Sequence, residues 1–187
     1  MSHYVGVVLG PDPEGQLAPY DENLEVEPYI DTCWDCEANP KHQPTCDTCN
    51  GAGKVETTTN KQGRWDFWRV GGRWRGFLVL KEGATGQLGD LTWEWTFNGP
   101  CTEDFSGRAD VAKAGDVDWL ATAAHWCSEW EREEFSAYAL VAEGVMRERS
   151  EWNGKEFVHF PDWDRFFLRM VTNVPPDTLI TVVDYHS

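Results

Sequence analysis

The chain has 187 residues and a formal net charge of −16, and 41% of its residues are hydrophobic. This length fits one domain with a core of its own, and the 11 tryptophans and 9 phenylalanines exclude a disordered chain. The acidic charge opposes stable binding to duplex DNA and to anionic membranes. No segment resembles a secretory signal or approaches the roughly 18 apolar residues of a membrane-spanning helix, so we expect a cytoplasmic protein.

The first half of the chain alternates strand-like segments with polar loops. Residues 4–9 (YVGVVL) are apolar and rich in β-branched side chains, which predicts a buried strand. Residues 10–31 are rich in Pro, Gly, Asp and Glu and predict an acidic loop with one irregular turn. Residues 64–81 predict two strands, or a strand and a tight turn, around Gly71-Gly72. Residues 91–97 (LTWEWTF) alternate apolar and polar side chains, as a half-buried strand does.

Two helices are expected in the second half. The first should begin near Asp116 or Asp118, either of which can cap it, because apolar residues follow at helical spacing. These residues are Trp119, Ala123, Trp126 and Trp130. The second helix should open at Pro161 and end before Pro175-Pro176. Its predicted buried stripe consists of Trp163, Phe166, Phe167, Met170 and Val171.

The remaining strands complete the predicted fold. Residues 135–142 and 145–149 read as strands joined at Glu143-Gly144, and residues 178–184 (TLITVVD) as the last strand. Strands at both ends of the chain, hairpins between them and two helices predict an α+β fold. We expect a mostly antiparallel sheet with both helices on one face, in a single domain spanning residues 1–187. The cysteine segment at 32–55 is then a small inserted zinc-ribbon-like hairpin.

Four of the six cysteines form two CxxC pairs, Cys33–Cys36 and Cys46–Cys49. Two such pairs can supply four thiolates in a tetrahedron around Zn²⁺, and four sulfurs close the shell, so the predicted zinc is structural. Glycines after Cys49 let backbone N–H groups point at sulfur. A redox motif needs only one pair. His42 is expected to be a loop residue, and Cys101 and Cys127, which lack paired spacing, are expected to be free thiols.

The second pair, in the stretch CDTCNGAG, resembles one CxxCxGxG repeat of the zinc domain of DnaJ-type chaperones. The resemblance covers about one repeat. Residues 37–40, after the first pair, lack the glycines, and the sequence has neither a J domain nor a run of four repeats. A chaperone role is therefore not implied.

Basic and aromatic residues alternate between Lys61 and Lys81. This stretch contains six basic residues and one acidic residue. Arginines, aromatic faces and glycine amides together can hold phosphates and stack bases. The sequence thus offers a phosphate-ligand site, but the same arginines can pair with the chain's own acids while the tryptophans form core. We call residues 64–75 the arginine–tryptophan segment. Its candidate ligand-binding residues are Trp68, Arg69, Gly71, Gly72, Arg73, Trp74 and Arg75.

No specific catalytic constellation is evident. The sequence contains no Walker loop, no GxSxG, no HExxH and no zinc-deaminase pattern, so no catalytic residue is predicted. Asp184 and His186 lie at the end of the last predicted strand, where functional groups often lie, but terminal residues are more often without such a role. His125 is expected to pack among tryptophans, and His159 to lie in a loop.

Three segments together resemble a set of small accessory proteins of tailed bacteriophages and prophages. The segments are LAPYDENLEVEPY at 17–29, WDFWRVGGRW at 65–74 and DTLITVVDYH at 177–186. Members of that set often carry Cys where this chain has Tyr185, and many lack the cysteine pairs, so the zinc module is expected to be replaceable. The resemblance implies expression in an infected bacterial cytoplasm and no established activity.

The leading functional hypothesis is a zinc-containing accessory protein that binds without turnover. Its partner would be a phosphate-bearing small molecule, such as a nucleotide signal, or a host protein, in a counter-defence role. The alternatives are a nucleotide-directed hydrolase or transferase and a virion assembly protein. The sequence leaves the oligomeric state open.

Overall fold

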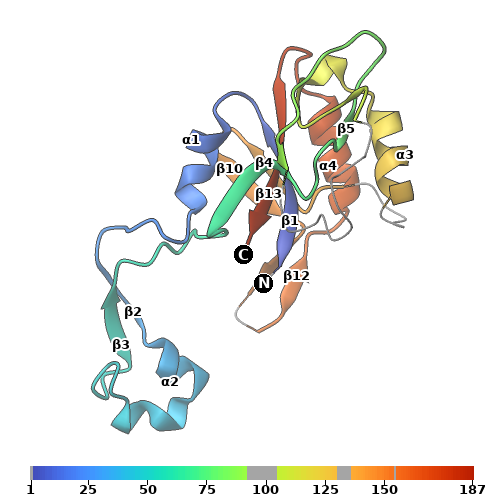
Figure 1. Ribbon diagram of the computed structural model, residues 1–187. Coiled ribbons are helices and arrows are strands. Elements are labelled where there is room, and N and C mark those ends of the chain that lie inside the picture. Colours follow the sequence, from blue (N-terminus) through green and yellow to red (C-terminus); the bar gives the residue numbers. More distant parts are fainter. Residues whose placement is uncertain (1, 92–104, 130–135, 154) are drawn as a thin grey trace.

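The computed structural model describes residues 2–91, 105–129, 136–153 and 155–187. Over this part of the chain the main sheet has the strand order β10-β9-β1-β13-β4-β6, and β8 pairs with β13 beside this path. Figure 1 labels β10, β1, β13 and β4 of this sheet. The strands of this sheet are β1 (His3–Leu9), β4 (Phe67–Gly72), β6 (Asp90–Leu91), β8 (Val111–Lys113), β9 (Ala139–Ala142), β10 (Val145–Glu148) and β13 (Leu179–His186).

The centre of the sheet is the pair formed by β1 and β13. They run antiparallel over their whole length, with His3 opposite His186 and Leu9 opposite Ile180. The apolar segments at 4–9 and 178–184 are thus confirmed as strands, because each is buried on both faces. The β1–β9 and β4–β6 pairs are parallel, and the other pairs of this sheet are antiparallel. The fold is α+β with a mostly antiparallel mixed sheet.

One face of the sheet is covered by α3 (Trp119–Glu129) and α4 (Trp163–Thr172), as predicted. Trp126 of α3 and Phe167 of α4 belong to the same buried apolar cluster as the odd-numbered apolar residues of β1. The carboxylate of Asp118, not that of Asp116, accepts the Ala121 N–H at 2.9 Å and begins α3. The buried residues of α4 are Trp163, Phe167 and Val171, while Phe166 and Met170 are partly buried beside them.

The opposite face is covered by a segment expected to be mostly loop. Leu17 of α1 (Pro13–Leu17) and Trp65 pack against Val8, Val183 and Tyr185. The prediction of an acidic loop at 10–31 is therefore corrected, because this region also holds η1 (Ala18–Tyr20) and β2 (Tyr29–Thr32). A helix of five residues is too short to show a hydrophobic period.

The cysteine segment projects from the rest of the molecule as a hairpin, at the lower left of Figure 1. Its strands are β2 and β3 (Lys54–Thr57), and α2 (Trp34–Ala38) and η2 (Pro40–Thr45) lie between them. The remaining elements are β5 (Leu78–Val79), β7 (Arg108–Ala109), η4 (Ala114–Asp116), β11 (Ser150–Trp152) and β12 (Phe157–His159).

Several predictions fall partly outside the described residues. Only Leu91 of the strand expected at 91–97 belongs to a described element, β6. Cys101, Trp130 and the start of the strand expected at 135–142 also lie outside them, whereas its end forms β9. Among the helices of the described ranges, none has the length and apolar character needed to cross a membrane.

Candidate metal centre and neighbouring polar clusters

The backbone of the 29–57 hairpin brings the two cysteine pairs together. Strands β2 and β3 pair antiparallel from Tyr29 opposite Thr57 to Thr32 opposite Lys54. Cys33 directly follows β2, and Cys36 lies one turn later in α2, which places both sulfurs on the same side of the hairpin. The second pair lies in the turns that lead into β3, and its Cys46 C=O accepts the Gly51 N–H at 3.2 Å.

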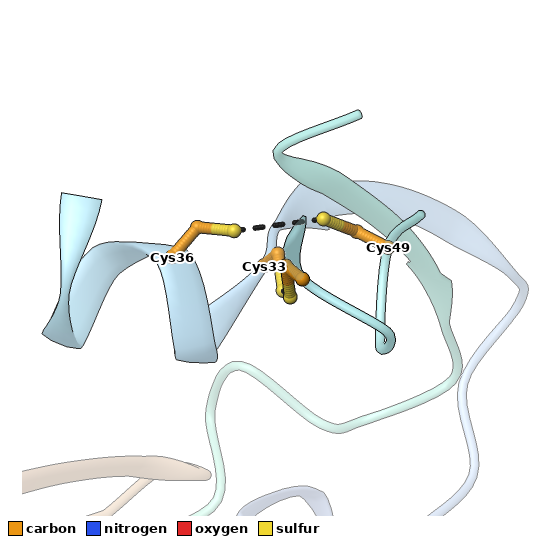
Figure 2. A group of neighbouring side chains, drawn as sticks. Cys33, Cys36 and Cys49 are labelled. Atoms are coloured by element: carbon orange, nitrogen blue, oxygen red, sulfur yellow. Dashed lines mark hydrogen bonds between the residues drawn. The ribbon is translucent and has the colours of Figure 1, made fainter. Parts of the chain in front are cut away.

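All four sulfur atoms lie within 4.8 Å of one another. The Cys33 and Cys46 sulfurs are 3.7 Å apart, and those of Cys36 and Cys49 are 3.5 Å apart. Figure 2 shows the side chains of Cys36, from α2, and Cys49, from the loop before β3, pointing toward each other. The four cysteines of the sequence prediction thus form one group that can hold a metal ion.

This cysteine group is buried without an apolar core around it. The four side chains are at most 7% exposed, yet among the described hydrophobic residues only the partly buried Val55 packs against them. The apolar clusters that hold the sheet and the helices contain none of the four cysteines. Side-chain packing by itself therefore provides little to hold this hairpin closed.

The surroundings of the sulfurs affect their ionisation unequally. Burial raises the pKa of the Cys33 and Cys36 thiols. Burial also acts to raise the pKa of Cys49, but the hydrogen bond from the Gly53 N–H, at 3.1 Å, and the neighbouring thiols lower it to about 7. The expected N–H group directed at sulfur is thus present at Gly53, whose φ of 70° suits glycine.

The two glycines of the arginine–tryptophan segment lie in close contact with buried aspartate side chains. Gly71 and Gly72 are buried and have φ angles of 73° and 57°. A Cβ at Gly71 would lie 2.6 Å from Asp110 Oδ2, and one at Gly72 would lie 2.5 Å from the Cβ of Asp184. No L side chain fits either position without displacing a carboxylate.

The backbone amides around this turn bind these internal carboxylates. Asp184 Oδ2 accepts the Arg73 N–H at 3.0 Å, and Asp110 accepts the N–H groups of Gly76 at 2.6 Å and Gly89 at 2.8 Å. Burial raises the pKa of Asp110, against the lowering effect of these amides. The Arg73 amide of the arginine–tryptophan segment therefore has an acceptor within the chain.

The side chains of the arginine–tryptophan segment do not share one surface. Trp68 packs edge-on against Trp65 on the α1 side of the sheet, at 6.5 Å between ring centroids. Trp74 lies 5.3 Å from Trp126 in the core on the α3 side. The Arg69 guanidinium lies over the Phe67 ring at 4.6 Å, and that of Arg75 lies over the Phe105 ring at 5.1 Å.

Two histidine–aspartate pairs, at the ends of β1 and β13, were not found by sequence reasoning. His3 Nδ1 lies 2.8 Å from Asp184 Oδ1, and His186 Nδ1 lies 2.5 Å from Asp66 Oδ1. The partners in these pairs are 181 and 120 residues apart in sequence. The sequence places Asp184 and His186 at a strand end, but no local pattern connects them to His3 or Asp66.

A polar cavity of about 390 Å³, which no sequence pattern predicts, lies on the α1 side of the sheet. Glu148 Oε1 accepts a hydrogen bond from the Tyr185 hydroxyl at 2.8 Å, and Arg64 Nε lies 3.6 Å from Oε2. Burial raises the pKa of Glu148, against the lowering effects of Tyr185 and Arg64. The cavity is lined by Tyr4, Gly63, Arg64, Tyr138, Glu148, Ser150, Glu151, Phe157 and Ser187.

Comparisons of the chain with protein-family models, with curated proteins and with solved structures found no match. The function is therefore inferred from the geometry of the sites.

Proposed function

We propose that this protein is a zinc-binding accessory protein whose Cys33, Cys36, Cys46 and Cys49 hold a structural Zn²⁺ in a partner-binding hairpin. The observation that carries the proposal is the buried group of four sulfurs within 4.8 Å of one another. A Zn²⁺ ion with four bonds of about 2.3 Å separates tetrahedral sulfurs by about 3.8 Å. The separations of 3.5 and 3.7 Å are close to that value.

The four cysteines suit a structural zinc site better than a catalytic metal site. Four thiolates favour Zn²⁺ over hard cations and leave no open position for substrate. The ion would also supply the cohesion that the hairpin lacks, since metal binding contributes directly to the folding free energy of small sites.

The hairpin presents apolar side chains to solvent. Ile30 of β2 is 64% exposed and Trp34 of α2 is 67% exposed, on a unit that extends away from the sheet. Exposed large apolar side chains on a projecting unit favour contact with a protein partner. The resemblance to phage proteins makes a host protein in the bacterial cytoplasm the expected partner, in a counter-defence role. No turnover at the metal is proposed.

Native mass spectrometry of the purified protein tests the metal assignment. The folded chain should carry the mass of one Zn²⁺, which is lost on denaturation in acid. Cys46→Ser should abolish stoichiometric binding, whereas Cys127→Ser, in α3, should retain it. Full zinc content in Cys46→Ser would overturn the proposal.

Co-purification from bacteria tests the partner-binding role. The variant Ile30→Ser/Trp34→Ser should keep its zinc and lose the partner that wild type retains. The matched control is Leu120→Ser, which removes another exposed apolar side chain, 83% exposed, far along the chain in α3. Equal recovery of partner with all three proteins would exclude the hairpin surface.

The other classes give different results in the same measurements. A small phosphate-bearing adduct released unchanged on denaturation would identify a ligand-sequestering protein. Release of a reaction product would indicate a hydrolase or transferase, and recovery of the chain in purified virions would indicate an assembly role.

A further inference from the structure

The register of the main sheet brings polar side chains together at one end of β1, β13 and β4. His3 lies opposite His186 in the β1–β13 ladder, and Phe67 lies opposite His186 in the β13–β4 ladder. Two residues before His186 in β13, Asp184 lies opposite Arg69. Because side chains two residues apart in a strand share a face, these residues lie on the same side of the sheet as Val5 and Val182, the side that α3 and α4 cover.

The carboxylates at this end orient both imidazole rings. His3 Nδ1 contacts Asp184 at 2.8 Å, His186 Nδ1 contacts Asp66 at 2.5 Å, and the two ring centroids are 5.1 Å apart. A carboxylate next to Nδ1 favours the tautomer with the proton on Nδ1. Nε2 of each ring is then the atom that can accept or donate a proton, as in histidines used for acid–base chemistry.

Two polar atoms of this cluster are buried without a hydrogen-bond partner. They are Nε2 of His186, a residue only 9% exposed, and Nε of Arg69. A buried polar group without a partner destabilises the folded state unless something binds it, and it therefore needs an explanation. The Arg69 guanidinium lies over the ring of Phe67, and Phe67 lies opposite His186 in the β13–β4 ladder. The His3 side chain remains 15% exposed, which provides access from solvent.

We propose that His3, His186 and Arg69 form a phosphate-ester site in which the two imidazoles act as base and acid. A guanidinium is the donor best matched to phosphate oxygens, and a phosphate oxygen would satisfy Arg69 Nε. Asp66 and Asp184 are positioning residues, since their carboxylates hold the Nδ1 atoms. The site lies in the main sheet and uses none of the four cysteines, so it is independent of the zinc proposal.

The proposed step is hydrolysis of a phosphodiester. One neutral imidazole accepts a proton from the attacking water while the new P–O bond forms. The other imidazole, protonated, donates its Nε2 proton to the ester oxygen as the old P–O bond breaks. The products are a phosphate monoester and an alcohol, nothing is oxidised or reduced, and solvent returns the pair to its starting protonation.

Hydrolysis of bis(4-nitrophenyl) phosphate by the untagged, full-length zinc protein tests this site. His3→Gln and His186→Gln should each lower the rate about 100-fold or more, as loss of an acid or base does. His159→Gln, which changes an exposed histidine of β12, should not lower it. Arg69→Lys keeps the charge but loses the planar donor, and should mainly raise KM. Chelation of the zinc should leave the hydrolysis in place.

Binding of inorganic phosphate gives a second readout that does not depend on turnover. Phosphate should shift the ring ¹⁵N signals of His3 and His186, but not that of His159, saturably in wild type and more weakly in Arg69→Gln. Absence of both hydrolysis and ring shifts would overturn the proposal, and so would hydrolysis that persists in the double variant His3→Gln/His186→Gln. Saturable phosphate binding without turnover would overturn the acid–base assignment.

Discussion

Asp110 and Asp184 show how single buried carboxylates fix the backbone of the arginine–tryptophan segment. Both are fully buried, and together they accept N–H groups from Arg73, Gly76 and Gly89. These hydrogen bonds hold the turn against the two buried side chains. The glycines are needed because those side chains leave no room for a Cβ.

Gly72→Ala tests this packing. Its Cβ would lie 2.5 Å from the Asp184 side chain at a φ of 57°, so we expect a loss of about 2–4 kcal/mol in the free energy of unfolding. Gly83→Ala is the matched control, with a φ of 76° and no described atom within 4 Å, and should cost about 1 kcal/mol. Urea denaturation measures both, and equal losses would exclude a role for the Asp184 contact.

Glu148 should introduce a pH dependence of opposite sign to that of an acid whose pKa is lowered on folding. Burial raises its pKa in the folded state, so the folded protein binds its proton more tightly than the unfolded chain does. This contribution to stability is present below the unfolded pKa of about 4.3 and is lost as pH rises through the folded value. In urea denaturation, the free energy of unfolding of Glu148→Gln relative to that of wild type should thus be higher at pH 7 than at pH 4. A difference that is independent of pH would contradict this.

At the scale of elements, local caps set where helices begin. Asp118 Oδ1 accepts the Ala121 N–H at 2.9 Å, whereas Asp116 lies in the preceding η4 turn. Asp118→Ala should lower the free energy of unfolding by about 1 kcal/mol, as loss of an N-cap does. Asp116→Ala should cost less, because Asp116 lies in η4 and not at the start of α3. Thermal denaturation of the two variants separates these outcomes, and the reverse order would reject the cap assignment.

The cysteine hairpin differs from the other elements in what holds it together. Its four sulfurs are buried against little besides one another, while β1, β13, α3 and α4 share large apolar clusters. An element without an apolar core depends on its metal for order.

At the scale of the whole molecule, zinc removal should therefore unfold one part and spare the rest. We expect hydrogen exchange after chelation to show lost protection at amides of 29–57 and unchanged protection at β1 and β13, the central strands. Cys127→Ser should exchange like wild type before and after chelation. Loss of protection across the central strands would mean that the hairpin and the sheet form one cooperative unit.

The sequence by itself determined the features that depend on short-range patterns. These features are recognised from residues close together in the sequence. They are the two CxxC pairs, the apolar strands at both ends of the chain, the Glu143-Gly144 turn and the apolar stripe of α4. A four-residue knuckle or a helical period does not need the rest of the fold to be recognised. The site predicted from the cysteines was found with the same four residues.

The tertiary structure decided what depends on contacts between distant segments. Pairing of β1 with β13 and of β13 with β4 brings His3, Asp66 and Asp184 together, although nothing in their local sequence relates them. Burial likewise decided that the glycine turn surrounds internal carboxylates, since the same N–H groups would suit a phosphate equally well. Residue type fixes which chemistry is available, and the fold fixes which partner is within 3 Å.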